Sequence, residues 1–158
     1  MGERRAGAET TPTLQPCQGE AAVMEARGFY SEDEGATPAP MVRIGIGFGR
    51  GNVVGASALI DTGADVCVFP ASLFRFRIGE KGEPIIVEMA DGTRVSSRIL
   101  YPSITAGDIR ETGVASVILP DAVPIVGRSF LNRLEVRLTA ARDLVRLATI
   151  RGARGTEA

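Results

Sequence analysis

Histidine is absent from the 158-residue chain, and its absence removes several kinds of catalytic site at once. A Ser-His-Asp or Cys-His arrangement needs an imidazole as its general base. Zinc sites of the His-Glu-x-x-His type need histidine ligands. If the protein is a hydrolase, carboxylates are therefore the obvious remaining reactive groups.

Cysteine is nearly absent as well. The two cysteines, Cys17 and Cys67, cannot build a zinc site, and nothing marks them as a disulfide. Cys67 lies in an apolar run, so we expect it to be a small buried side chain. Neither a metal ion nor an organic cofactor is expected.

Long apolar runs and a strong net charge are also missing. No stretch approaches the roughly 18 apolar residues of a membrane span, and no apolar segment follows the charged residues 1–5 as in a signal peptide. The formal net charge of −1 creates no global field that would attract nucleic acid or an anionic membrane. We therefore expect a cytoplasmic protein that binds neither.

Residues 1–40 are rich in Gly, Glu, Thr, Pro and Ala and lack a regular apolar pattern, apart from a short patch at 23–30. This composition is typical of a disordered or loosely ordered arm. A pro-segment, a polyprotein linker and a plain arm all stay open as its role. The pattern changes at Met41, so we expect one domain over residues 41–150 and a flexible tail over 151–158.

Within residues 41–150 the apolar residues follow the periods of short β-strands. Strands are expected at 42–48, 53–60, 66–69, 85–89, 93–100, 136–138 and 144–150. A further strand pair is expected to flank Gly107-Asp108, with its second strand at 114–119. A helical turn is expected at 70–74 and one short helix at 128–134. Short strands with turn signals every eight to twelve residues, roughly, predict an all-β domain closed into a barrel or a sandwich.

Asp61 stands at the end of an apolar strand and is followed by Thr62, Gly63 and Ala64. Such a sequence also suits a hairpin turn, where Asp and Gly serve the backbone. Apolar segments lie on both sides, however, and a hairpin turn would be solvated. A carboxylate held between two buried strands is costly unless something pairs with it.

These residues resemble the active-site loop of the retropepsins, the aspartic proteases that include the retroviral enzymes. Asp61-Thr62-Gly63-Ala64-Asp65 is identical to the loop of that family. Ile125-Val126-Gly127-Arg128-Ser129-Phe130-Leu131 is similar to its second signature, two aliphatic residues followed by Gly-Arg and a short helix. The resemblance covers roughly residues 41–150 and implies a retropepsin-like all-β fold that forms half of a two-fold dimer.

The resemblance also implies roles for the residues of the loop. Asp61 would be the catalytic aspartate, supplied once by each copy. Thr62 would bond the loop of the other copy, Gly63 would offer its carbonyl to the substrate, and Ala64 would complete the loop. Asp65 would cap the bound peptide.

Further roles fall on residues outside the loop. Arg128 would form an ion pair with Asp65, although two unrelated surface charges remain the alternative. Val126 and Gly127 would pack beneath the loop. The flap, a hairpin that closes over substrate, would span residues 85–99.

The tip of this flap would lie near Ala90, Asp91 and Gly92. The retroviral pattern is richer in glycine at the tip, so substrate contacts there would differ. An ordinary exposed turn remains the alternative for Asp91.

The implied activity is the hydrolysis of peptide bonds in a peptide or protein substrate. Two carboxylates a few ångströms apart do not both ionise easily, so the pair holds one proton. The ionised member takes a proton from water while the protonated one hydrogen-bonds the scissile carbonyl. Because one chain offers one such aspartate, the mechanism requires a homodimer. A catalytically silent dimerisation or peptide-binding module and an unrelated β-domain stay open as alternatives.

Overall fold

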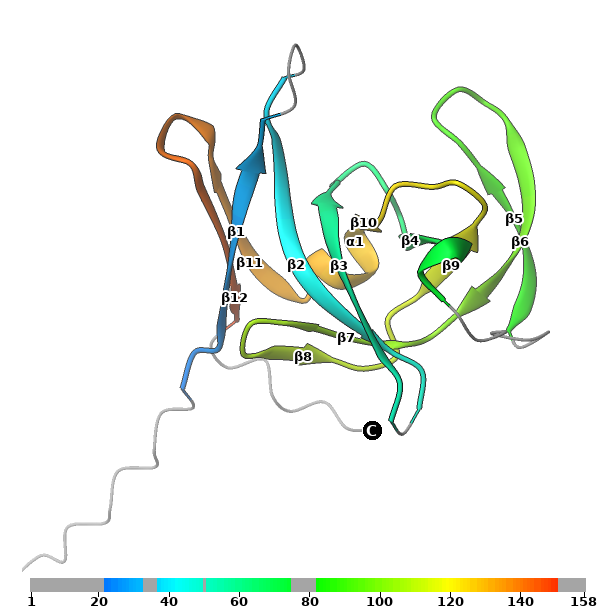
Figure 1. Cartoon of the computed structure of the whole chain (residues 1–158), viewed down its shortest axis with the longest axis horizontal. Helices are drawn as coiled ribbons and strands as arrows, with labels where there is room; N and C mark the ends of the chain where they lie inside the picture. Colours follow the sequence, from blue (N-terminus) through cyan, green and yellow to red (C-terminus); the bar gives the residue numbers. More distant parts are fainter. Residues whose placement is uncertain (1–21, 33–36, 50, 75–81, 151–158) are drawn as a thin grey trace, which may run out of the picture.

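The computed structural model describes residues 22–32, 37–49, 51–74 and 82–150, which form an all-β domain with one short helix (Figure 1). The strands are β1 Glu25–Ser31, β2 Ala39–Gly47, β3 Val53–Ile60, β4 Cys67–Pro70, β5 Glu83–Glu88, β6 Arg94–Leu100, β7 Ser103–Ala106, β8 Ile109–Glu111, β9 Ser116–Leu119, β10 Ile125–Val126, β11 Leu134–Thr139 and β12 Leu144–Thr149. The helix is α1 Arg128–Leu131, and single 3-10 turns are η1 Ala71–Leu73 and η2 Ala140–Arg142. The predicted all-β class is confirmed, while Cys17 and the predicted tail at 151–158 lie outside the described residues.

The strands form one sheet in the order β11-β12-β1-β2-β3-β10-β4-β9-β6-β5, with β7 paired to β2 and β8 paired to β7. Most neighbours are antiparallel, but β10 runs parallel to β3, and β9 runs parallel to β4. The predicted closed barrel is wrong, because β11 and β5 end this order and do not pair with each other in the described part of the chain. The β5–β6 hairpin joins the sheet only where Ile99 and Leu100 meet β9, and it projects charged side chains into solvent.

Most predicted hairpins are present, namely β2–β3, β5–β6 and β11–β12. The pair around Gly107-Asp108 is β7–β8, and it ends at Glu111. The expected strand at 114–119 is instead a separate strand, β9, which pairs with β4 and β6. The chain breaks between β8 and β9 because Gly113 has a φ of 63° and the amide of Val114 donates to Pro102 O at 3.0 Å.

Strand β1 lies inside the segment that we expected to be a loosely ordered arm. It pairs with β12 through Glu25–Gly28 and with β2 through Phe29–Ser31, so the sheet begins at Glu25 rather than at Met41. The residues of β1 that pack against the rest of the sheet are small. Ala26 is 3% exposed, and a Cβ on Gly28 would lie 2.0 Å from Met41 O. Small residues allow close strand packing but leave little apolar signal in the sequence, which explains the difference.

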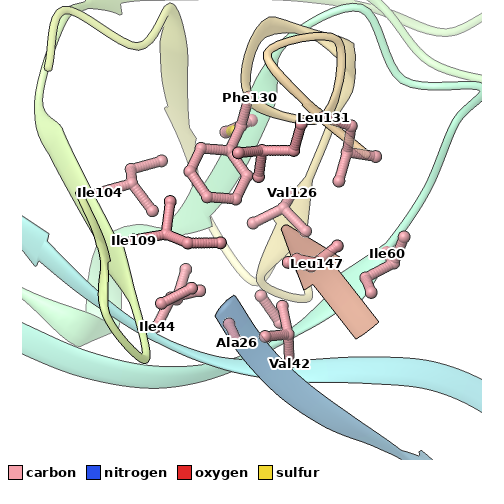
Figure 2. Close-up of a cluster of buried hydrophobic side chains, with 14 of the residues drawn as sticks. Ala26, Val42, Ile44, Ile60, Ile104, Ile109, Val126, Phe130, Leu131 and Leu147 are labelled. Atoms are coloured by element: carbon pink, nitrogen blue, oxygen red, sulfur yellow. The ribbon is translucent and has the colours of Figure 1, made fainter. Parts of the chain in front are cut away.

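The apolar core lies between the sheet and α1. In Figure 2 the ring of Phe130 stands beside Ile109, Val126 and Leu131, and all four are buried. Full burial of side chains of this size stabilises a fold by about 1.5–3 kcal/mol each. Phe130 and Leu131 therefore anchor α1 although the helix is only four residues long, and this anchoring fixes where the polar first turn of α1 stands.

A substitution at Gly28 tests whether β1 belongs to the folded domain. Ala at this position would overlap Met41 O and Val145 Cγ1, so we expect Gly28→Ala to lower the free energy of unfolding by about 1–3 kcal/mol. The matched control is Gly55→Ala, where the nearest atom to the new Cβ is Ile44 O at 3.9 Å. Urea unfolding followed by circular dichroism measures both, and equal midpoints for the two variants would contradict the assignment of β1.

Candidate active site

Asp61 is the first residue after β3, and it leaves the sheet from an interior strand. β3 lies between β2 and β10, and Ile60 is paired with Val126 of β10. The amide of Asp61 donates to Val126 O at 3.1 Å. Residues 61–66, which we call the Asp61 loop, therefore start from a point that two neighbouring strands fix.

Asp61 is half-buried, and the orientation of its carboxylate is set by the loop itself. Its Oδ1 accepts a hydrogen bond from the amide of Gly63 at 2.8 Å. The amide of Ala64 donates to the main-chain oxygen of Asp61 at 3.4 Å. Oδ2 receives no hydrogen bond from the described residues, and Thr62 and Gly63 are exposed.

Helix α1 contacts the second half of the Asp61 loop through main-chain hydrogen bonds. The amide of Arg128 donates to Ala64 O at 2.8 Å, and the amide of Ser129 donates to Asp65 O at 3.0 Å. The guanidinium of Arg128 also forms an ion pair with the carboxylate of Asp65, as the resemblance implied. Because the Asp65 side chain is 81% exposed, this pair orients the two side chains and adds little stability, about 0–1 kcal/mol.

The turn between β10 and α1 packs directly against the loop. Val126 is fully buried. A Cβ on Gly127 would lie 2.3 Å from Val66 O and 2.8 Å from Ala64 O. Only glycine fits there, so the helix reaches the loop closely enough for its amides to bond the carbonyls of Ala64 and Asp65.

Ser129 takes part in this contact, and the sequence did not single it out. Its hydroxyl donates to Ala115 O at 2.8 Å and lies 3.5 Å from the thiol of Cys67. The amide of Cys67 donates to the same carbonyl at 3.1 Å. One hydroxyl thus connects α1 to β4 and to the chain entering β9. The only signal in the sequence was a small polar residue between Arg128 and the apolar Phe130.

Cys67 is fully buried, which confirms the prediction that it is a small core side chain. Burial raises the pKa of its thiol, because the charged thiolate loses its hydration. The thiol therefore stays neutral and serves as packing beneath the Asp61 loop.

The predicted tip residues Ala90, Asp91 and Gly92 form the exposed turn of the β5–β6 hairpin. The amide of Gly92 donates to Met89 O at 2.9 Å, and that of Thr93 donates to Asp91 Oδ1 at 2.8 Å. These bonds remain within the hairpin, which β10, β4 and β9 separate from β3. The structure thus gathers Asp61 to Asp65 with Val126 to Arg128, and it leaves the tip apart from them.

Sites of two other kinds are not found in the described ranges. Among residues 22–32, 37–49, 51–74 and 82–150, no three His, Cys, Asp or Glu side chains come together as a metal ion would need. None of the helices in these ranges has the length and apolar character to cross a membrane.

An all-β domain in which an Asp-Thr-Gly loop is hydrogen-bonded to a short helix that begins at Gly-Arg is the arrangement expected of an aspartic protease domain. The family model described as retroviral aspartyl protease matches residues 36–139, which is more than half of the chain. The chain belongs to the retroviral aspartyl protease family. A comparison with curated proteins found no match.

A substitution at Gly127 tests the contact between α1 and the Asp61 loop. Gly127→Ala would force two main-chain carbonyls away, so we expect a loss of about 1–3 kcal/mol in the free energy of unfolding. Ser129→Ala, which removes one hydrogen bond without a clash, should cost about 0.5–1.5 kcal/mol. A Gly127→Ala protein with the urea midpoint of the wild type would show that the helix does not press on the loop.

The hairpin tip should respond to pH through Asp91. The hydrogen bond from the Thr93 amide lowers the pKa of Asp91 below its ordinary value of 3.8. A lowered pKa means that the bond is kept at neutral pH and lost as the pH falls through that lowered value. The amide resonance of Thr93, followed by NMR, should titrate with a midpoint below 3.8 and should not titrate in Asp91→Asn. A midpoint at or above 3.8 in the wild type would contradict this contact.

Proposed function

We propose that the protein is a homodimeric aspartic endopeptidase that hydrolyses peptide bonds with a water activated between two Asp61 carboxylates. The observation that carries this proposal is the way Asp61 is presented. Strand β3 fixes the main chain at Asp61, and the hydrogen bonds from α1 fix the main chain at Ala64 and Asp65. The Gly63 amide fixes one carboxylate oxygen of Asp61. Membership of the retroviral aspartyl protease family supports the same chemistry.

The need for a second copy follows from the contents of one Asp61 loop. One chain contributes two carboxylates there, but that of Asp65 is paired with Arg128, which leaves Asp61 as the single carboxylate for the reaction. Its Oδ2 is unbonded by the described residues, and Thr62 and Gly63 are exposed beside it. A two-fold axis close to Asp61 brings the second carboxylate next to the first. Thr62 is then placed to bond the loop of the other copy, which holds the two carboxylates side by side.

The proposed chemistry uses the repulsion between these two carboxylates. Two like charges in contact share one proton, so one Asp61 acts as a base and the other as an acid. The base takes a proton from the water as its oxygen attacks the scissile carbonyl carbon, and the acid hydrogen-bonds the carbonyl oxygen. The tetrahedral intermediate then collapses, the C–N bond breaks, and the leaving nitrogen takes up a proton. No acyl-enzyme forms.

The substrate we propose is an extended polypeptide with apolar side chains near the cleaved bond. On one face of the β5–β6 hairpin, Ile85 and Val87 lie beside Val95 and are half-buried, whereas the opposite face is exposed. Closure of this hairpin over the Asp61 loop would present that apolar face to the peptide. Ala90, Asp91 and Gly92 would then contact the substrate main chain, and Asp65 would cap it.

Asp61→Asn provides the direct test. The variant keeps the shape of the side chain but cannot provide the shared proton and charge, so peptide cleavage should fall by at least about a thousandfold, below detection in most assays. Asp108→Asn is the matched control, because it makes the same chemical change on an exposed turn of β7–β8. Cleavage of a peptide library by each purified protein, across a range of pH, gives both rates.

A wild-type profile that falls at both low and high pH would support a pair that works with one proton. Equal cleavage by Asp61→Asn and the wild type would refute the proposal. A stable dimer without cleavage at any pH would favour a silent module that binds peptides.

A further inference from the structure

Three arginines lie opposite one another on the outer face of β1, β12 and β11, which stand side by side in Figure 1. Arg27 of β1 is paired with Arg146 of β12, and Arg146 is also paired with Arg137 of β11. Leu147, next to Arg146, is fully buried in the core. Side chains alternate between the two faces of a sheet, so Arg146 and its two partners point away from the core. We call these three residues the arginine row.

The arginine row brings like charges close together. The Thr149 amide of β12 donates to Met24 O of the chain entering β1 at 3.0 Å. Hydrogen-bonded and non-hydrogen-bonded pairs alternate along antiparallel strands, so Arg27 and Arg146 form a non-hydrogen-bonded pair with Cα atoms about 4.5 Å apart. Like charges directly opposite each other are destabilising unless an anion lies between them.

One member of the row has a carboxylate partner. Arg146 forms an ion pair with Glu25 through Nη2, and its Nε and Nη1 groups form no hydrogen bond with the described residues. Arg27 and Arg137 are exposed, and neither forms an ion pair or a side-chain hydrogen bond within the described part of the chain. Arg27 and Arg146 therefore keep donors for a further anion.

A hollow of about 590 Å³ adjoins the arginine row. Arg146 lines it, and so does Ala148, which follows two residues later on the same face of β12. Ala148 lies between Glu25 and Glu135 of the neighbouring strands and is 2% exposed. Ile150, also on the lining, is 48% exposed. The hollow thus offers apolar surface that leads toward the guanidinium group of Arg146.

The charges on this face favour one negative charge over two. The three guanidinium groups of the arginine row stand against the two carboxylates of Glu25 and Glu135, which leaves one positive charge. A carboxylate neutralises that charge. A phosphate carries about −1.5 to −2 near pH 7, so the two glutamates would repel it more strongly.

We propose that Arg27 and Arg146 bind the carboxylate of a small ligand, and that the hollow over Ala148 and Ile150 receives an apolar chain attached to it. Guanidinium and carboxylate groups form charge-assisted, often bidentate hydrogen bonds. Arg137 adds positive charge from the third strand. Two sources share this chemistry, a short fatty acid and the C-terminus of a peptide that ends in an apolar residue.

Binding of simple probes to the full chain tests the ligand class. Hexanoate has the carboxylate and an apolar chain, so it should bind at least about tenfold more tightly than acetate, which cannot fill the hollow. Hexylamine has the same apolar chain with the opposite charge and should not bind. Titrations followed by NMR give each dissociation constant, and hexanoate should shift the amide resonances of Arg27, Arg146 and Ala148.

Two variants separate the contribution of charge from that of the apolar surface. Arg27→Gln removes one exposed, unpaired guanidinium group, so hexanoate should bind on the order of tenfold more weakly. Arg110→Gln makes the same change on the exposed side of β8 and should leave the affinity unchanged. Ile150→Ser should weaken the binding of hexanoate but not that of acetate.

A peptide arm distinguishes the two sources of the carboxylate. Acetyl-Ala-Leu with a free C-terminus should bind and its C-terminal amide should not, if the ligand is a peptide terminus. Binding of hexanoate without the peptide would assign the site to a fatty acid. The proposal is refuted if hexanoate shifts none of these resonances, if inorganic phosphate binds more tightly than hexanoate, or if Arg27→Gln and Arg110→Gln bind hexanoate equally. None of these measurements depends on peptide cleavage.

Discussion

Two main-chain hydrogen bonds, from the first turn of α1 to the Asp61 loop, are the contact on which the rest of the site depends. The donors are the amides of Arg128 and Ser129, which the start of a helix leaves free, and the acceptors are carbonyls of Ala64 and Asp65. Gly127 makes the contact possible because any side chain there would strike the loop. The helix has only four residues, so buried side chains, rather than its own hydrogen bonds, hold it in place.

The domain combines this rigid centre with one exposed projection, the β5–β6 hairpin. Around Asp61 the strands are interior and the side chains beneath are buried. The β5–β6 hairpin joins β9 through two residues only. Regions with few buried contacts open at lower free energy than the core, so this hairpin should open more readily than the strands that hold Asp61.

Local patterns in the sequence predicted most strands because alternation and turn residues act over a few neighbours, as in β2–β3 and β5–β6. The Asp61 loop and the α1 segment were predicted from their resemblance to one family, which also implied the pair between Asp65 and Arg128. β1 was missed because its inward residues are small, and sheet closure was predicted wrongly because pairing between distant strands decides it. Ser129 was missed since its acceptor is a main-chain carbonyl, which leaves no trace in the sequence.

The position of β12 in the sheet has a consequence for the order of assembly on the ribosome. β12 lies between β1 and β11, although translation produces it after both. β10 and α1, which fix the Asp61 loop, likewise emerge long after β3 and β4. Contacts between such distant segments form slowly and late. A nascent chain would therefore expose Asp61 without its supports, so the loop would reach its final geometry only once translation of the domain is complete.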